Sequence, residues 1–245
     1  MAFIDEYTIK ARQAPATIAL APAILATYAL LPELRSTWGA IGALLAALGL
    51  PAGLAYVARS CGKRLEPRLF QSWGGKPTTA MLRWRDGRIS ADTKHRYHDT
   101  LRAAGVDLPS AEDEERDPTA ADAKYESAGE WILRHARDKR AFPFVFTQNI
   151  NYGFARNLLG LKWIGFGFAA ACVGAETVLV GWTLWTVRDV SAFLAVSDAV
   201  SIGLAVFWLW AVRPAWVHDA AVAYSRALLE VCESGKRVAP PTGPA

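Results

Sequence analysis

Four apolar runs constrain this chain more than any other feature of its sequence. They extend roughly over Ala14–Leu31, Trp38–Ala58, Trp163–Val187 and Phe193–Val212. Each run has about the length that a helix needs to cross ~30 Å of hydrocarbon at 1.5 Å per residue. The pattern predicts an all-α polytopic membrane protein with four transmembrane helices.

The first run is the weakest of the four. Pro15, Pro22 and Pro32 interrupt or bound it, so a buried two-helix hairpin is the alternative for this region. A cleaved signal peptide is disfavoured, because Asp5 and Glu6 open the chain and a second apolar run follows at once.

The distribution of Lys and Arg predicts the orientation. Nineteen of the 27 basic residues lie in segment 59–162, whereas the loops after the first and third spans contain only Arg35 and Arg188. Because positive residues collect on the cytoplasmic side, we expect both termini and the central segment to be cytoplasmic, in a bacterial inner membrane. The three cysteines are few and odd in number, as is typical of a reducing compartment.

This topology divides the chain into five segments. They are an N-terminal cytoplasmic segment 1–13, a transmembrane hairpin 14–58, a cytoplasmic regulatory domain 59–162, a second transmembrane hairpin 163–212, and a C-terminal helix with a loose tail, 213–245.

The central segment contains start and stop signals for several helices, which predict a mainly helical domain inserted between spans two and three. We expect one helix after Pro77 with a Thr cap, and another from Ser90 or Asp92 to Gly105. A third is expected to begin with a capping box formed by Thr119 and Asp122, and a fourth after Pro143.

Charge in this segment is arranged in blocks. Residues 59–105 have a net charge of +7, residues 106–130 of −7, and residues 131–162 of +5. The first block interleaves cations with aromatic rings, a combination that binds single-stranded nucleic acid or nucleotides. The predicted ligand residues are Arg83, Trp84, Arg85, Arg88, Lys94, Arg96 and Tyr97. A solvated helix face is the alternative, and the acidic block could cover the patch as an electrostatic latch.

Other cations lie close to the predicted spans and fit contact with anionic lipid head groups. They are Arg59, Lys63, Arg64, Arg68, Arg156 and Lys162.

The sequence contains no complete catalytic motif, and we predict no enzymatic activity, metal or cofactor. The stretch "SWGGKPTT" lacks the upstream glycine of a phosphate loop, and Pro77 replaces its hydroxyl residue. His95 and His98 form an HxxH pair without further ligands at metal-site spacing, which favours a packing or surface role.

The phrases "SWGGKPTTAMLRWRD", "TKHRYHDTL" and "RAFPFVFTQNINYGFARNLLGLKWIG" resemble the membrane effector family of the Hailong anti-phage defence system. The resemblance covers roughly residues 59–165. It implies a homotetrameric ion channel that depolarises the infected cell and is gated by single-stranded oligodeoxyadenylate from a nucleotidyltransferase-like partner. It supplies no ligand residues for this chain.

Carboxylates inside the third and fourth apolar runs are the most informative residues. An acid near mid-bilayer costs on the order of 2.5 to 3.5 kcal/mol, so it usually faces a bundle interior or water. Counting from the span ends, Glu176 lies about 16 Å and Asp198 about 8 Å from the external surface, at different levels. Together with Ser201, they are predicted to line a pore formed by several copies. A neutral Glu176 bonded to a neighbouring helix is the alternative.

These observations favour an oligomeric ion channel gated through its cytoplasmic domain by a nucleic-acid or nucleotide ligand, and the resemblance implies that it acts in anti-phage defence. A non-enzymatic membrane scaffold that recruits a cytoplasmic partner, and a small transporter, remain as alternatives.

Overall fold

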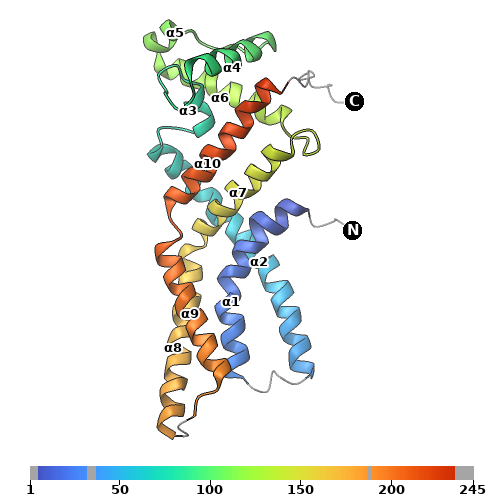
Figure 1. The fold of residues 1–245 in the computed structure, drawn as a ribbon, viewed down its shortest axis with the longest axis vertical. Coiled ribbons are helices and arrows are strands. Elements are labelled where there is room, and N and C mark those ends of the chain that lie inside the picture. Colours follow the sequence, from blue (N-terminus) through green and yellow to red (C-terminus); the bar gives the residue numbers. More distant parts are fainter. Residues whose placement is uncertain (1–4, 32–36, 187–188, 235–245) are drawn as a thin grey trace. The chain divides into compact units, whose positions relative to one another are not determined.

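The computed structural model describes residues 5–31, 37–186 and 189–234, with residues 37–48 described in their backbone alone (Figure 1). Every regular element in these ranges is a helical segment, and no strand occurs among them. The predicted all-helical class is confirmed for this part of the chain.

The chain divides into two compact units. Unit 1 consists of Met1–Glu66 and Gly153–Val217, and unit 2 of Pro67–Tyr152 and His218–Ala245. Three helices contribute residues to both units: α2 (Thr37–Ser72), α7 (Pro143–Gly160) and α10 (Pro214–Leu229). The structure therefore groups most of the C-terminal helix with the central segment, from which the sequence analysis had separated it.

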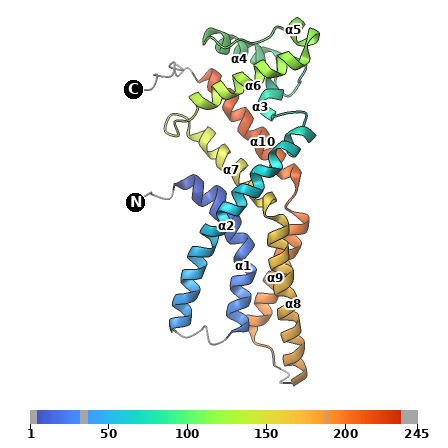
Figure 2. The ribbon, with the colours of Figure 1, turned by 180° about the vertical axis from the view of Figure 1, so that it is seen from behind.

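Unit 1 is built around three packed helices. A π-helical turn, η1 (Thr8–Gln13), leads into α1 (Ala14–Leu30), and α8 (Lys162–Thr186) and α9 (Ala192–Trp210) pack against α1 and against each other (Figures 1 and 2). Ala16, Ala19 and Ala169 are fully buried in this core. A side chain at Gly165 would place its Cβ 2.3 Å from the buried ring of Trp208. Small residues thus allow these helices to approach closely.

Three described helical stretches are long and apolar enough to cross a membrane, namely Thr8–Leu30, Lys162–Thr186 and Ala192–Trp210. They correspond to the first, third and fourth predicted spans, so the structure is compatible with a membrane location. The second predicted span, Trp38–Ala58, falls in α2, and its side chains as far as residue 48 lie outside the described part.

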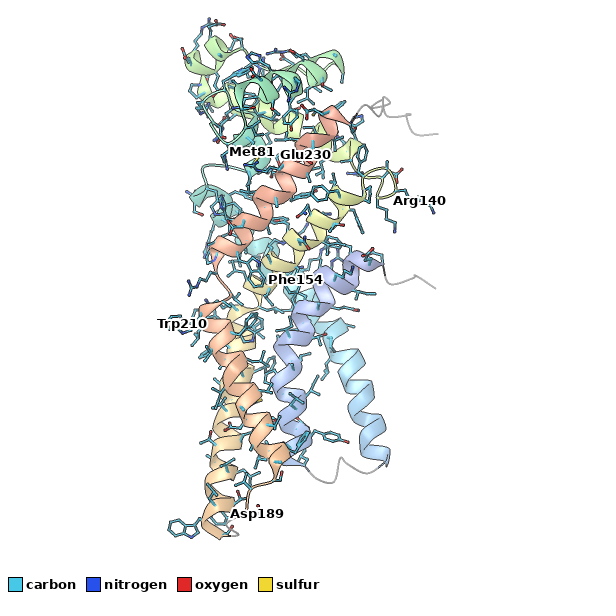
Figure 3. The ribbon with its side chains drawn as sticks, viewed as in Figure 1. Met81, Arg140, Phe154, Asp189, Trp210 and Glu230 are labelled. Carbon is cyan, nitrogen blue, oxygen red and sulfur yellow. The ribbon has the colours of Figure 1, made fainter. Side chains whose placement is uncertain are left out.

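Exposed tryptophans mark two levels along the hairpin of α8 and α9. Trp163 lies in the first turn of α8 and Trp210 ends α9, whereas Trp182 and Trp185 lie near the far end of α8. Figure 3 shows Trp210 at the opposite end of this hairpin from Asp189. The roughly 20 residues between the two levels span about 30 Å, which is the thickness of the hydrocarbon core. This spacing is typical of aromatic belts at the two surfaces of a bilayer.

The helices α2 and α7 cross with their backbones in contact. A Cβ added at Gly160 would lie 2.5 Å from the backbone nitrogen of Gly62, and one added at Gly62 would lie 2.6 Å from Oδ1 of Asn157. Asn157 is fully buried and donates a hydrogen bond of 2.7 Å from its side-chain amide to the carbonyl oxygen of Ala11. The crossing therefore also fixes η1, at the start of the first predicted span.

Two cations that the sequence assigned to lipid head groups are used inside unit 1. Arg156 is buried and pairs with Glu66. Lys162 donates from Nζ to the carbonyl oxygens of Leu209 and Val212, at 3.2 and 2.8 Å. A cation at the C-terminus of a helix donates hydrogen bonds to the last carbonyl groups of that helix and interacts favourably with the helix dipole. Lys162 therefore caps α9. The lipid assignment needs correction for these two residues.

Unit 2 contains four complete helices and parts of α2, α7 and α10. The helices are α3 (Pro77–Leu82), α4 (Ala91–Ala103), α5 (Ala111–Arg116) and α6 (Pro118–His135), and the 3₁₀ turn η3 (Glu230–Glu233) follows α10. Its fully buried side chains include Met81, Leu82, Leu101, Tyr125, Ile132 and Leu229.

Two of the predicted helix boundaries in this unit are confirmed. Ser90 is the N-cap of α4, where its hydroxyl accepts a hydrogen bond from the backbone N–H of Thr93. The helix ends before Gly105, whose φ of +82° favours glycine. The helix predicted after Pro143 is α7.

Two predicted caps are wrong, and one helix was missed. No side chain caps α3, whose first residue is Pro77. In α6 the cap is Asp117 rather than Thr119, because its carboxylate accepts hydrogen bonds from the first turn. The missed helix is α5, which begins with a capping box between Ser110 and Asp113.

Replacing Gly160 tests the crossing of α2 and α7. Gly160→Ala should destabilise the folded chain by about 1 to 3 kcal/mol, because the new methyl group overlaps the Gly62 backbone. The measurement is thermal unfolding of the full chain in detergent. Gly167→Ala is the matched control, since nothing lies within 4 Å of a Cβ there. Equal unfolding temperatures for the two variants would contradict the close crossing.

Candidate functional site

The buried carboxyl group of Glu176 is the centre of the first candidate site. Glu176 lies in α8 and is fully buried among the helices of unit 1. The hydroxyl group of Ser197, on α9, donates a hydrogen bond to Oε1 of Glu176. Ser197 is itself buried, so this contact joins α8 and α9 across their interface.

The hydrogen bond corrects the expectation that Glu176 and Asp198 lie at different levels. Ser197 directly precedes Asp198, so the carboxyl group of Glu176 reaches the level of Asp198 to within a few ångströms. The residue count assumed that α8 and α9 end at the same height. Figure 1 shows instead that α8 extends beyond the first turn of α9.

Several polar atoms of this cluster are buried and have no hydrogen-bond partner among the described residues. They are Oε2 of Glu176, Oδ1 of Asp198 and Oγ of Ser201. Ser197 and Ser201 are four residues apart on α9, so they lie on the same face of that helix. We call Glu176, Ser197, Asp198 and Ser201 the intramembrane polar cluster. It brings together all three predicted pore residues and adds Ser197.

Several side-chain oxygen atoms of the cluster can accept further hydrogen bonds, because only Oε1 of Glu176 accepts one from the described residues. Carboxylate and hydroxyl oxygens can coordinate a cation or accept hydrogen bonds from water. Within the described part of the chain, however, no group of three His, Cys, Asp or Glu side chains could hold a metal ion. The arrangement therefore suits a transient contact with a cation or water better than a resident metal.

The second candidate site is the cationic patch of unit 2, and the structure pairs much of it with the acidic block. Arg83 forms two hydrogen bonds of 2.8 Å with the carboxylate of Asp122. Arg85 bonds both Asp122 and Glu114, each at 2.8 Å. The acidic block thus covers this part of the patch through direct ion pairs.

Glu114 is the most highly coordinated of these carboxylates. It is buried and accepts hydrogen bonds from the backbone N–H groups of Trp84 and Arg85, and from the hydroxyl group of Tyr125 at 2.6 Å. Burial alone would raise the pKa of Glu114, but the hydrogen bonds from Tyr125 and the backbone, together with Arg85, hold its pKa below the usual value. Burial, together with the same contact, raises the pKa of Tyr125. Glu114 therefore organises the turn between α3 and α4 as an ionised group.

Lys94 and His98 face the interior rather than a ligand. Lys94 is only 2% exposed, and its ammonium group donates to the backbone carbonyl oxygens of Arg83 and Asp86. His98 is fully buried, with Nε2 lying 2.8 Å from the carbonyl oxygen of Leu82. Burial lowers the pKa of His98 to about 4, which keeps the ring neutral at neutral pH. The structure thus gives His98 the predicted packing role and removes Lys94 from the accessible patch.

Two other predicted residues lie together in a pocket of about 190 Å³. Arg88 and Tyr97 line it with Arg226, which comes from α10 and which the sequence analysis did not select. The remaining lining residues are Ile89, Ser90, Thr93 and Glu230. We call this space the α4–α10 pocket.

The other members of the predicted set do not line this pocket, although Arg96 donates a hydrogen bond of 2.9 Å to the hydroxyl group of Thr93 at its edge. Arg96 is exposed and pairs with Glu233 at 2.7 Å. Trp84 is half-buried and donates from its indole nitrogen to the carbonyl oxygen of Pro109. The structure thus separates the predicted ligand residues into a paired group, a buried lysine and a pocket.

Comparisons of the chain with protein-family models, curated proteins and solved structures found no match. A functional assignment therefore depends on the residues themselves.

Removing Glu114 tests its organising role. Glu114→Ala leaves two backbone N–H groups and the Tyr125 hydroxyl without their acceptor, so we expect a loss of about 3 kcal/mol. Hydrogen exchange at the amides of Trp84 and Arg85 should become faster. Glu115→Ala is the control, because Glu115 is exposed and adjacent.

The same contact predicts a pH dependence of stability. Because the pKa of Glu114 is lowered in the folded state, its contribution is complete above its unfolded pKa of about 4.3 and is lost as pH falls through the folded value. Unfolding of the wild type and of Glu114→Gln should therefore converge at acid pH. A constant difference between them at every pH would contradict an ionised Glu114.

Proposed function

We propose that the protein is an oligomeric membrane ion channel, gated through unit 2 by a nucleic-acid or nucleotide ligand, and that it acts as an anti-phage defence effector. The second predicted span and the cytoplasmic placement of both termini belong to this proposal. The defence role, the homotetramer, the nucleotidyltransferase-like partner and oligodeoxyadenylate as ligand rest on the sequence resemblance alone.

The intramembrane polar cluster is the observation that carries the channel proposal. A carboxyl group in the middle of an apolar span costs about 2.5 to 3.5 kcal/mol. One hydrogen bond between membrane helices, such as that from Ser197, returns only about 1 to 2 kcal/mol. A purely structural role therefore leaves Glu176 unfavourable, and the unpartnered oxygens beside it add to the cost. Contact with a permeating cation or with water offsets this cost.

A full burial of Glu176 within one chain corresponds to a closed state in this proposal. Opening requires a relative movement of α8 and α9 that breaks the bond between Glu176 and Ser197. The carboxyl groups of several copies then form a ring, and an ionised ring favours cations over anions.

The α4–α10 pocket supports gating through unit 2. Arg226 and Arg88 line it, the latter with its guanidinium group also bound to the carboxylate of Asp86, and Ser90 and Thr93 add hydroxyl groups at the N-terminus of α4. Guanidinium and hydroxyl groups are donors that bind phosphate oxygens. Arg226 belongs to α10, and only residues 211–213 separate α10 from α9 in the chain. A ligand held by Arg226 thus acts on the helix that directly follows the polar cluster.

Currents through planar bilayers test the role of Glu176. Glu176→Gln keeps a side chain that can bond Ser197 but removes the charge of the open state. We expect assembly to be unchanged, with a several-fold lower cation conductance and weaker selectivity over chloride. Thr177→Val is the control, because Thr177 is the exposed neighbour on α8. Unchanged conductance and selectivity in Glu176→Gln would assign the residue to packing, and the absence of current with and without oligodeoxyadenylate would contradict the channel.

Binding of a labelled short oligodeoxyadenylate tests the pocket. Arg226→Glu should weaken binding and reduce its salt dependence, because fewer counterions are released on binding. Arg134→Glu, on the exposed face of α6, should change little. This variant is preferable to charge reversal at Arg83 or Arg85, whose pairing with Asp122 and Glu114 would couple binding to folding. Equal affinity of Arg226→Glu and the wild type would exclude the pocket.

A further inference from the structure

A row of unpaired cations follows the apolar part of α2. Arg59, Lys63, Arg64 and Arg68 are exposed or half-exposed, and none of them pairs with an acidic residue in the part of the chain that the structure describes. They differ in this from Arg156 and from most cations of unit 2, which have carboxylate partners. Their charge is therefore available to an external anion.

Five residues of this region line a hollow of about 310 Å³ along one side of α2. They are Tyr56, Arg59, Ser60, Lys63 and Arg64. Tyr56, Ser60 and Arg64 are four residues apart, as are Arg59 and Lys63, so these side chains share one broad face of the helix. The three cations and the Ser60 hydroxyl group provide the donors that a phosphate group requires. We call this face the α2 basic stripe.

The helix surface changes character along its axis at this stripe. On the N-terminal side, Leu50 is 54% exposed and Tyr56 is 73% exposed, and Ala52 and Gly53 are also accessible. About 10 Å separates Tyr56 from Lys63 along the helix, which is enough to cross one head-group layer of ~5 to 8 Å. An apolar surface, then a tyrosine, then cations is the order that a helix shows as it leaves the hydrocarbon on the cytoplasmic side.

We propose that the α2 basic stripe binds the phosphate head group of an anionic phospholipid. The long stems of Lys63 and Arg64 allow their charges to reach the phosphate while their methylene groups cover apolar surface. Tyr56 packs against the glycerol and upper acyl region, with its hydroxyl group toward the head group. A free phosphate ion would use the same cations but would gain nothing from Tyr56 or from the apolar surface beyond it. The proposal requires membrane insertion but not ion conduction, so it can hold even if the chain carries no current.

Lipid retention by the purified full chain in detergent tests the site. The protein is titrated with short-chain phosphatidylglycerol or phosphatidylcholine, and bound lipids are counted by native mass spectrometry. We expect a preference for phosphatidylglycerol that falls roughly tenfold or more in Lys63→Glu/Arg64→Glu, because each surface cation contributes to the attraction. The matched control is Arg134→Glu/Arg137→Glu, which reverses two exposed charges of unit 2.

Two further variants distinguish binding of a lipid from binding of a soluble anion, and a loss of binding from a loss of folding. Tyr56→Ala leaves the charge unchanged and should also weaken phosphatidylglycerol binding, whereas it should not affect binding of inorganic phosphate. Lys63→Gln/Arg64→Gln removes both charges without introducing acids and should reproduce the loss with unchanged helical content. The proposal is overturned if either double variant retains phosphatidylglycerol like the wild type. It is also overturned if inorganic phosphate binds the stripe while the two lipids bind equally.

Discussion

The contact between Gly62 and Gly160 is the constraint on which unit 1 depends. With no side chain at either position, α2 and α7 cross at backbone distance, and Asn157 is held where its amide reaches the carbonyl oxygen of Ala11. Arg156 and Glu66 add an ion pair at the same crossing. Because α8 starts two residues after α7 ends, the crossing also fixes where the third apolar helix begins. Two glycines thus determine how the first and third apolar helices start.

A polar cluster inside such a unit carries a desolvation penalty, and the packing of the surrounding helices does not require polar side chains there. The core around it is built from alanines and from Trp208, whose ring fills the space above Gly165. Replacing Glu176 and Ser197 with apolar residues of similar volume would preserve this packing and remove the desolvation penalty. The presence of four polar side chains within about one helical turn, with several oxygens lacking partners among the described residues, fits the proposed contact with water or a cation.

The sequence predicted local features better than relations between distant residues, although α5 and two helix caps were not predicted correctly. Ser90 and Gly105 are local signals, and they bound α4 as expected. The caps of α3 and α6 could also have been predicted from local signals. A proline occupies the first position of each helix, so the cap is the residue before the proline. At α6 this residue is Asp117. The level of Glu176 was not available, because it depends on how far α8 extends past α9.

The ion pairing of the cations also depends on the folded structure, and it determines which of them are accessible to a ligand. Charge blocks are visible in the sequence, but the pairing of Arg83 with Asp122 joins residues 39 positions apart and depends on the folded unit. These ion pairs occupy the first half of the predicted patch, and Lys94 is buried beneath it. What remains open is the pocket completed by Arg226, from a helix that composition had assigned to another segment. Arg226 belongs to α10 and Glu230 to the turn η3 that follows it, and only residues 211–213 separate α10 from α9, which carries Ser197, Asp198 and Ser201. In the proposed mechanism, an anion held by Arg226 therefore contacts the helix that is next in sequence to α9.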